Sequence, residues 1–378
     1  MKFIHLSDLH LGKRVNEFSM IEDQQDILNK ILDIIRAEVP DAVLIAGDIY
    51  DKSVPSAEAV GLLDEFMVRL SQFSTQSFII SGNHDSAERL AFGGRLMAES
   101  GIHLSPVYDG HVEPTTLEDA YGPVDIYMLP FVKPTHVRSF FPEETIETYT
   151  DAVRVAVEQM HVNPEHRNVL ISHQFVTGAE RSDSEISVGG TDNVDAAVFA
   201  PFDYVALGHI HGPQNVGSER IRYCGTPLKY SFSEAKHHKS VSVIELGEKG
   251  SFNLRTIPLV PLHDWVELKG TYQELTLKSF YEHTSYRTDY VHITLTDEED
   301  VPNAMAKLRV IYRNLMKLDY DNRRTRHEAE ITGTENVKQK TELELFSELY
   351  ELQNGTPMSP EQTEFVTGLI EKIREEQR

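Results

Sequence analysis

The sequence predicts an α/β fold in which buried strands alternate with helices along most of the chain. Short runs such as 42–46 and 204–207 are apolar on both faces, which is typical of strands covered on both sides. Segments such as 24–36 lie between these runs and carry apolar residues at helical spacing. Polar residues able to bind metals follow several of the runs directly. We therefore expect strands covered by helices or by a second sheet, with a functional site at their carboxyl ends.

The elements of the first domain follow from these two patterns. Helix 56–70, for example, is expected because its apolar residues, from Leu62 to Leu70, share one face. In chain order the expected elements are strand 3–6, helix 24–36, strand 42–46, helix 56–70, strand 78–80, and strands 126–129, 169–171, 204–207 and 241–246.

The pattern changes near Pro258 and Pro261, where a small α+β domain is expected to begin. This second domain contains no recognisable cluster of metal ligands. Its expected elements are strand 265–268, a helix-like patch at 274–283, strand 290–295 and a helix at 302–318.

Two amphipathic helices are expected after a polar linker at 335–340. The first covers about 341–353 and ends at an Asn-Gly pair. The second begins at Ser359, because Ser359 as N-cap, Pro360 at the first helical position and Gln362 form a capping box. The predicted domains are therefore 1–258, 259–334 and 335–378.

Length and composition indicate a globular protein of two or three domains, because 378 residues are too many for one ordinary core. Hydrophobic residues make up 40% of the chain and charged residues 25%. No apolar run is long enough to span a bilayer, and the early first strand leaves no room for a secretory signal. The single cysteine, Cys224, excludes an internal disulfide and a cysteine metal cluster. We expect a reducing, cytoplasmic location.

The chain is strongly acidic. It carries 36 Lys and Arg residues against 60 Asp and Glu residues, a net charge of −24. Such a charge argues against a protein that holds nucleic acid alone by releasing counterions. It does not exclude a nuclease, because bound metals and a partner subunit can supply positive charge.

Five short clusters of ligand-type residues predict one metal site, although each cluster taken alone is a weak signal. Each cluster follows an apolar run, and strand ends converge in space. The predicted metal ligands are Asp8, His10, Asp48, Asn83, His173, His209 and His211. We expect them to hold two divalent ions, bridged by Asp48. Carboxylate, amide and imidazole ligands suit Mn²⁺, with Fe²⁺ as the alternative. Other histidines, such as His5 and His103, are interpreted as ordinary core or surface residues.

The order of these motifs, D-x-H, G-D, G-N-H-D, H and G-H-x-H over residues 1 to 250, resembles the calcineurin-like metallophosphoesterase superfamily. The resemblance implies a two-sheet β-sandwich flanked by helices, with both metals at the strand ends. It implies that Asp8, His10, Asp48 and His211 hold one metal. It implies that Asp48, Asn83, His173 and His209 hold the other. A hydroxide formed from metal-bound water would attack the phosphate ester.

His84 is the expected catalytic residue beside the metals. In the superfamily a histidine at this position stabilises the transition state or protonates the leaving oxygen. Asp51, three residues after Asp48, is the candidate to orient His84. The alternative for Asp51 is a cap within its loop.

Among members of the superfamily, the chain is most similar to the SbcD family of nuclease subunits. Purple acid phosphatases need a tyrosine three residues after the aspartate, whereas Tyr50 comes one position early, and protein phosphatases carry G-N-H-E where this chain has Asp85. The stretches that carry the similarity include residues 5–13, 82–86, 187–194 and 223–234. Archaeal and eukaryotic relatives place a histidine where this chain has Asp51.

The SbcD resemblance implies DNA as substrate and an SMC-type ATPase, similar to SbcC, as partner. The complex would be a double-strand exonuclease and a single-strand or hairpin endonuclease in DNA repair, near the nucleoid. The chain itself has no Walker-type nucleotide loop. The family also implies a homodimer, formed through the segment near 86–100, and hence a heterotetramer with the ATPase.

The C-terminal helices are expected to grip the coiled-coil base of that ATPase. The alternative is that both helices pack on the body of the protein. The expected anchors are Leu345, Phe346, Leu349, Phe365, Leu369 and Ile373. The candidate contacts to DNA phosphates are Lys13, Arg14, Arg89, Lys229 and Lys239.

Two rival hypotheses stay open. One keeps the fold but changes the substrate to a small phosphodiester, a nucleotide or a phosphoprotein, which the net charge of −24 favours. The other is a non-catalytic scaffold that has kept the fold. Retention of every ligand together with His84 argues against the scaffold.

Overall fold

The computed structural model describes residues 1–183, 185, 192–323 and 325, and separate residues between 343 and 370. The chain divides into two compact units. The first comprises residues 1–269, 273–293 and 303–318, and the second comprises 270–272, 294–302 and the chain from 319 onward.

Two six-stranded sheets form the centre of the first unit. Across the first sheet the strands are β16 (Phe252–Pro258), β15 (Ser240–Leu246), β1 (Lys2–Leu6), β4 (Ala42–Ala46), β5 (Gln76–Ile80) and β6 (Ile102–Leu104). Across the second they are β13 (Gln214–Val216), β14 (Ser218–Tyr223), β12 (Tyr204–Gly208), β9 (Arg167–His173), β8 (Gly122–Leu129) and β7 (Thr115–Asp119).

The middle strands of each sheet run parallel to one another. β1, β4, β5 and β6 are parallel neighbours, with Phe3 opposite Ala42 and Ala42 opposite Gln76. β8, β9, β12 and β14 are likewise parallel, and Gly208 lies opposite His173. β15, β16, β13 and β7 are added antiparallel at the margins. The parallel strands of one sheet therefore end at the same edge, as expected for a site at strand ends.

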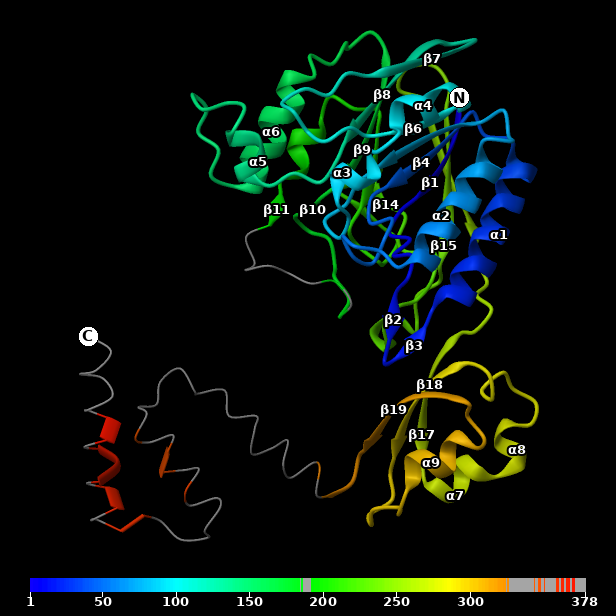
Figure 1. Ribbon diagram of the computed structural model, residues 1–378, viewed down its shortest axis with the longest axis vertical. Helices are drawn as coiled ribbons and strands as arrows, with labels where there is room; N and C mark the ends of the chain where they lie inside the picture. The colour runs from blue at the N-terminus through cyan, green and yellow to red at the C-terminus, as the bar shows by residue number, and fades with distance from the viewer. Residues whose placement is uncertain are drawn as a thin grey trace. The chain divides into compact units, whose positions relative to one another are not determined.

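The sheets pack face to face and each is covered by helices on its outer face, so the predicted sandwich is confirmed. Buried side chains from both sheets, such as Leu44 and Ile126, form the layer between them. Helices α1 (Ile21–Glu38) and α2 (Ala57–Leu70) pack on the first sheet. Helices α5 (Pro134–Arg138) and α6 (Tyr149–Gln159) lie on the opposite side of the sandwich, beside the second sheet (Figure 1).

Polar side chains also join the two sheets. His5 on β1 lies 2.8 Å from the Tyr204 hydroxyl and 3.1 Å from the Leu207 carbonyl oxygen, both on β12. Arg222 on β14 donates to the Ser242 hydroxyl on β15 at 2.9 Å. These contacts satisfy buried polar groups in a layer that is otherwise apolar.

The long helices have recognisable starts. Ser56 caps α2 by accepting from the Ala59 N–H at 3.2 Å, which confirms helix 56–70 to within one residue. Thr148 and Asp151 form a capping box at the start of α6, an element missing from the expected set.

The other elements of the first unit are short. They are β2 (Arg14–Val15), β3 (Phe18–Ser19), α3 (Ala87–Leu90), α4 (Gly94–Met97), η1 (Ala98–Ser100), β10 (Phe175–Val176), β11 (Asn193–Val194), η2 (Ala196–Phe199) and η3 (Phe232–Glu234).

A small α+β part follows β16. Its three-stranded sheet has the order β17 (Trp265–Gly270), β18 (Tyr290–Leu295) and β19 (Asn314–Tyr320). Its helices are α7 (Tyr272–Thr276), α8 (Lys278–Tyr281) and α9 (Ala304–Arg309).

The helix expected at 302–318 is wrong, because α9 ends at Arg309 and 314–320 is a strand. The Arg309 guanidinium donates to the Leu315 carbonyl at 3.2 Å, and the Tyr312 hydroxyl donates to the Leu275 carbonyl at 2.6 Å. These bonds hold a turn in the middle of the segment, and pairing in the sheet then outweighs helical propensity.

The second unit is described only in part. The Thr296 N–H donates to the Gly270 carbonyl at 3.1 Å, and the Asp321 N–H donates to the Leu295 carbonyl at 2.8 Å. The predicted capping box is confirmed, because the Ser359 N–H donates to the Gln362 amide oxygen at 2.8 Å and the Gln362 N–H donates to the Ser359 hydroxyl at 3.3 Å. The domain division at 258 and 334 stays a prediction. Within the described part of the chain, no helix is both long and apolar enough to cross a membrane.

The layer between the sheets should carry much of the stability. Leu44 is fully buried in this layer, so Leu44→Ala should lower the free energy of unfolding by about 2–5 kcal/mol through lost contacts and a residual cavity. Urea unfolding followed by circular dichroism measures the change. Val68→Ala, at a position 51% exposed on α2, is the control and should change stability by no more than about 0.5 kcal/mol. Equal effects of the two changes would contradict a core between the sheets.

Candidate metal centre

All seven predicted metal ligands lie together at the carboxyl ends of strands from both sheets. They lie at or just beyond the ends of β1, β4, β5, β9 and β12, which finish at Leu6, Ala46, Ile80, His173 and Gly208. Two groups can be distinguished within the cluster, with Asp48 between them.

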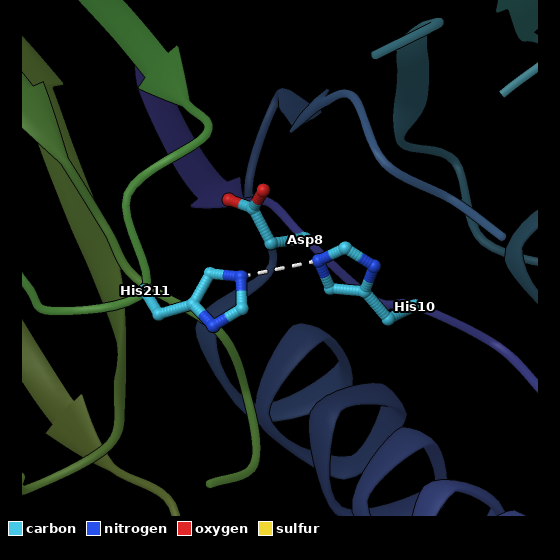
Figure 2. Close-up of side chains that lie close together, drawn as sticks. All are labelled: Asp8, His10 and His211. Carbon is cyan, nitrogen blue, oxygen red and sulfur yellow. Dashed lines mark hydrogen bonds between the residues drawn. The ribbon is translucent and has the colours of Figure 1, made fainter. Parts of the chain in front are cut away.

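The first group contains Asp8, His10 and His211. The Nε2 atoms of His10 and His211 face each other at 3.2 Å, with the Asp8 carboxylate beside them (Figure 2). One ligand atom from each of the three residues lies within 4.8 Å of the others. Both oxygens of Asp8 also accept from the His209 N–H at 3.1 Å, which ties the loops after β1 and β12 together.

The second group contains Asn83, His173 and His209. The Asn83 side-chain oxygen lies 2.9 Å from His209 Nδ1 and 3.0 Å from His173 Nε2. His173 Nδ1 lies 2.8 Å from the Ala46 carbonyl oxygen, which can only accept a hydrogen bond. The Nδ1–H tautomer is therefore favoured, and the lone pair of Nε2 faces the site.

Asp48 lies between the two groups. Its Oδ2 atom is 3.4 Å from His173 Nε2 and 3.7 Å from His10 Nε2. Its Oδ1 atom accepts from the His84 N–H at 2.9 Å. A carboxylate in this position has the geometry to bridge two cations.

The donors fit divalent cations. Two atoms that each bind one ion at about 2.1 Å lie roughly 3 Å apart, and the distances within both groups are close to this value. His209 Nε2 is buried and has no hydrogen-bond partner among the described residues. Oxygen and nitrogen donors without a thiolate suit Mn²⁺ or Fe²⁺ better than a structural zinc.

Burial and mutual charge set the protonation of the cluster. Burial lowers the pKa of His209 to about 3 and the pKa of His10 well below its usual value, so both rings are neutral donors. Burial opposes ionisation of Asp48, but the charge of His173 outweighs it and holds the pKa of Asp48 well below its usual value. Burial likewise opposes protonation of His173, but Asp48 raises its pKa to about 9. A cation can therefore replace the proton that Asp48 and His173 share.

The backbone of the ligand loops is unusual. Asp8, His10 and Asp48 have φ values of 54°, 45° and 49°, and His209 has 103°, all in the region that favours glycine. Asp8 and His10 therefore do not point into one site through the alternation of side chains along a strand. Strained conformations of this kind persist only where the surrounding structure imposes them.

Two glycines allow the loops to approach one another. A Cβ atom on Gly208 would collide with the carbonyl oxygen of Ala46, and one on Gly82 would collide with the carboxylate and backbone nitrogen of Asp48. Glycine is thus required at Gly208 for close contact between the two sheets, and at Gly82 for close contact between the loops that follow β4 and β5 of the first sheet.

His84 lies at the open side of the centre, with its side chain 25% exposed. Its Nδ1 donates to the main-chain carbonyl of Asp51 at 2.9 Å, and its Nε2 lies 4.0 Å from Asp48 Oδ2. The Asp51 carboxylate instead pairs with Lys13 at 2.7 Å. The expectation that the Asp51 side chain orients His84 is therefore corrected, because the orienting group is its backbone oxygen.

Three residues that support the ligands were not among the predicted site residues. The Asp85 carboxylate accepts from the N–H groups of Ile49, Tyr50 and Gly82 at 2.9–3.0 Å, so it joins two ligand loops. Gln24 donates to the carbonyl of His10 at 2.7 Å, and the Tyr230 hydroxyl donates to the carbonyl of Leu9 at 2.7 Å. Asp85 stands in the G-N-H-D motif, whereas Gln24 and Tyr230 carried no signal of this role.

The five basic residues expected at DNA phosphates occupy different environments. Arg14 and Arg89 are exposed, donating to the carbonyls of Glu17 and Ser53, and Lys13 is half-buried. The structure contradicts DNA contact by Lys229 and Lys239, which are 8% and 5% exposed. Both are buried because they pair internally, Lys229 with Asp264 at 2.8 Å and Lys239 with Glu234 at 2.6 Å.

The expected anchors for a partner are described only in part. Leu345, Leu349 and Ile373 lie outside the described residues. Phe346, Phe365 and Leu369 are 45%, 72% and 48% exposed.

Comparisons with known proteins agree with this geometry. A family model for calcineurin-like phosphoesterases matches residues 1–213, and a model for the type 5 capsule protein repressor C-terminal domain matches residues 260–354. The SbcD subunit of the nuclease SbcCD from Staphylococcus epidermidis is 34% identical over 323 residues, covering 84% of this chain and 85% of the relative. The protein of the same name from Staphylococcus saprophyticus is also 34% identical, with 84% of each chain covered.

Solved structures are more distant. A dimetal phosphatase from Danio rerio aligns at 12% identity with a TM-score of 0.42, over 69% of this chain and 96% of that chain. A score this low adds nothing to the sequence relationships.

The glycine contacts lead to a test of the site geometry. Gly82→Ala should displace the Asp48 carboxylate and lower the affinity for Mn²⁺ at least tenfold, as measured by isothermal titration calorimetry. Gly61→Ala is the matched control, because nothing lies within 4 Å of the added Cβ on α2. This control should keep its metal affinity and gain about 0.5–1 kcal/mol of stability. Unchanged affinity in Gly82→Ala would show that Asp48 is not held by this contact.

Proposed function

Because this chain belongs to the calcineurin-like phosphoesterase family and, within it, to the family of SbcD nuclease subunits, we propose that it is a metal-dependent DNA phosphodiesterase. The observation that carries the proposal is the Asp48 carboxylate between two groups of donors, all of them buried except Asn83, with His84 beside it on the open side. Paired cations bridged in this way are suited to the in-line displacement at a phosphate ester.

We assign Asp8, His10, Asp48 and His211 to one cation, and Asp48, Asn83, His173 and His209 to the other. When bound, the two divalent ions supply Lewis-acid chemistry that activates water and neutralises charge on the phosphate. Mn²⁺ is the proposed metal, with Fe²⁺ as the alternative, because the donors are carboxylate, amide and imidazole groups.

His84 is the proposed proton donor to the leaving oxygen. Because the Asp51 carbonyl holds Nδ1–H at 2.9 Å, the ring is fixed with Nε2 toward the centre. A protonated imidazole in this position carries its second proton on Nε2, where the leaving oxygen of a bound phosphodiester would lie. The side chain of His84 is 25% exposed, which is consistent with access to substrate.

The proposed substrate is DNA, cut as a double-strand exonuclease and as a single-strand or hairpin endonuclease during repair and recombination. The proposed partner is an SbcC-like ATPase, since the curated relatives are subunits named for that complex. The exposed Phe346, Phe365 and Leu369 support docking of the C-terminal segment on such a partner.

The rival function is hydrolysis of small phosphodiesters or phosphoproteins by the same centre. The net charge of −24 favours this rival, because it repels a polyanionic substrate. High activity on bis-p-nitrophenyl phosphate with no cleavage of linear or hairpin DNA, even with the ATPase partner present, would decide for the rival.

Removal of His84 tests the mechanism. With Mn²⁺ present, His84→Ala should reduce DNA cleavage about 10²–10⁴-fold, because the leaving oxygen loses its proton donor. The bound Mn²⁺ should be unchanged in calorimetry, because we assign His84 to no metal. His283→Ala, at a histidine whose side chain is 88% exposed, is the control and should retain full activity. Loss of metal together with activity would contradict the role given to His84.

A homodimer through the segment near 86–100 is also part of the proposal. Phe92 and Leu96 are 85% and 78% exposed around the short helices α3 and α4. Two large apolar side chains at such exposure are more typical of an interface than of an ordinary surface. In a dimer with twofold symmetry, Phe92 and Leu96 of one subunit would pack against the same two residues of the other subunit.

Substitution of this pair tests the dimer. The double variant Phe92→Ser, Leu96→Ser should convert a dimer of about twice 42.9 kDa into a monomer, as measured by light scattering after size exclusion. Val310→Ser, at the 79% exposed residue that follows α9, is the control and should stay dimeric. A dimer that survives the double variant would place the interface elsewhere.

A further inference from the structure

One of the histidines in the metal centre is contacted on both of its ring nitrogens. His211 Nε2 faces His10 Nε2 at 3.2 Å, on the side of the proposed cation. His211 Nδ1 lies 3.3 Å from Glu234 Oε1, on the side of the protein interior. The two faces of the ring thus have different partners, as expected of a ligand held by a supporting residue.

Glu234 is an unusual residue to find in that place. It is fully buried at the end of the short helix η3, whereas the proposed ligands themselves lie at strand ends. An isolated carboxylate in such a position would be strongly destabilising. Its second oxygen is paired, because Lys239 Nζ donates to Oε2 at 2.6 Å.

Lys239 is itself fixed on three sides. Besides Glu234, its ammonium donates to the Thr226 hydroxyl at 2.6 Å and to the main-chain carbonyl of His211 at 2.9 Å. The ammonium therefore has an acceptor for each of its three protons, all of them buried. Lys239 contacts the backbone of the same histidine whose ring contacts Glu234, so ring and backbone are held by one ion pair.

The charges in this network are consistent with an acceptor role for Glu234. The Lys239 ammonium lies 2.6 Å from Oε2 of Glu234, the oxygen other than the one nearest His211, so the buried carboxylate has a cationic partner. The carboxylate can thus accept the Nδ1–H of His211, which leaves the lone pair of Nε2 available to a cation.

We propose that Glu234 and Lys239 are positioning residues for His211, which set the tautomer and orientation of its ring for metal binding. The proposal rests on the metal-dependent function proposed above. Glu234 holds the proton on Nδ1, and Lys239 pairs with the other oxygen of Glu234 and with the carbonyl of His211, which holds the carboxylate in place beside the ring. Loss of supporting residues of this kind typically lowers metal affinity 10–100-fold.

The test compares metal binding in two carboxylate variants. Glu234→Gln keeps the size of the side chain but removes its charge, and should lower the affinity of one Mn²⁺ site 10–100-fold, with the other site little changed. Isothermal titration calorimetry of the full chain with Mn²⁺ alone gives both affinities. An unchanged pair of affinities overturns the proposal.

The chain offers a matched control. Asp125, on β8, is a buried carboxylate that is 4% exposed. It lies 2.8 Å from His166 Nδ1 and contacts none of the proposed ligands. Asp125→Asn should leave both affinities for Mn²⁺ unchanged. An equal loss of affinity in this variant would show that Glu234 acts only through general stability and would overturn the proposal.

Variants of Lys239 separate charge balance from packing. Lys239→Arg keeps the positive charge and should retain most of the affinity for Mn²⁺. Lys239→Met removes the charge and should lower the affinity of the same Mn²⁺ site that Glu234→Gln weakens. Equal affinities in the Arg and Met variants overturn the role of Lys239.

A second measurement needs no variant of the network. In the metal-free protein labelled with ¹⁵N-histidine, the His211 signals, identified by their loss in His211→Gln, should show a protonated Nδ1. A neutral ring protonated on Nε2 instead overturns the proposal. Mn²⁺ binding by the parent protein without any cleavage of DNA would count against the proposed nuclease function alone, since these readouts do not depend on cleavage.

Discussion

The close approach of the two sheets at the ends of their strands is the constraint on which the rest of the structure depends. Gly208 lies against the Ala46 carbonyl, so β12 of one sheet nearly touches β4 of the other. The same approach brings His173 within 2.8 Å of Ala46 and His209 within 3.1 Å of Asp8. The geometry of the metal centre therefore depends on how the two sheets pack, because a change in the distance between the sheets would separate the proposed ligands.

The centre concentrates charge that a protein interior ordinarily excludes. Asp8 and Asp48 are both buried within a ring of histidines, and burial raises the pKa of Asp8 to about 6. Part of the free energy needed to bury these charges is offset by hydrogen bonds, because the N–H groups of His209 and His84 donate to the carboxylates of Asp8 and Asp48. Bound cations would offset the remainder, which links metal binding to the stability of the fold.

Positive side chains near the centre are engaged inside the protein. Lys13 pairs with Asp51, Lys229 with Asp264 and Lys239 with Glu234. In a chain of net charge −24, the proposed attraction to a phosphate backbone would have to come from bound cations and from a partner subunit. The acidity of the chain is consistent with a subunit that cuts DNA held by its complex and does not itself grip DNA tightly.

The sequence alone predicted an α/β fold, most strands and the seven side chains that gather at the candidate centre, because apolar periodicity and short motifs are local properties, and the family resemblance added the two-sheet sandwich. Strand 42–46 and helix 56–70 were predicted within a residue. The predicted helix at 302–318 was wrong in its second half. Hydrogen bonds around Tyr312 and the pairing of β19 in its sheet override the local helical pattern there. Tertiary structure also decided which carbonyl orients His84, why Lys239 is buried and that Glu234 contacts His211. Such contacts join residues that become neighbours only when the two sheets pack together, so the spacing of residues along the chain does not predict them.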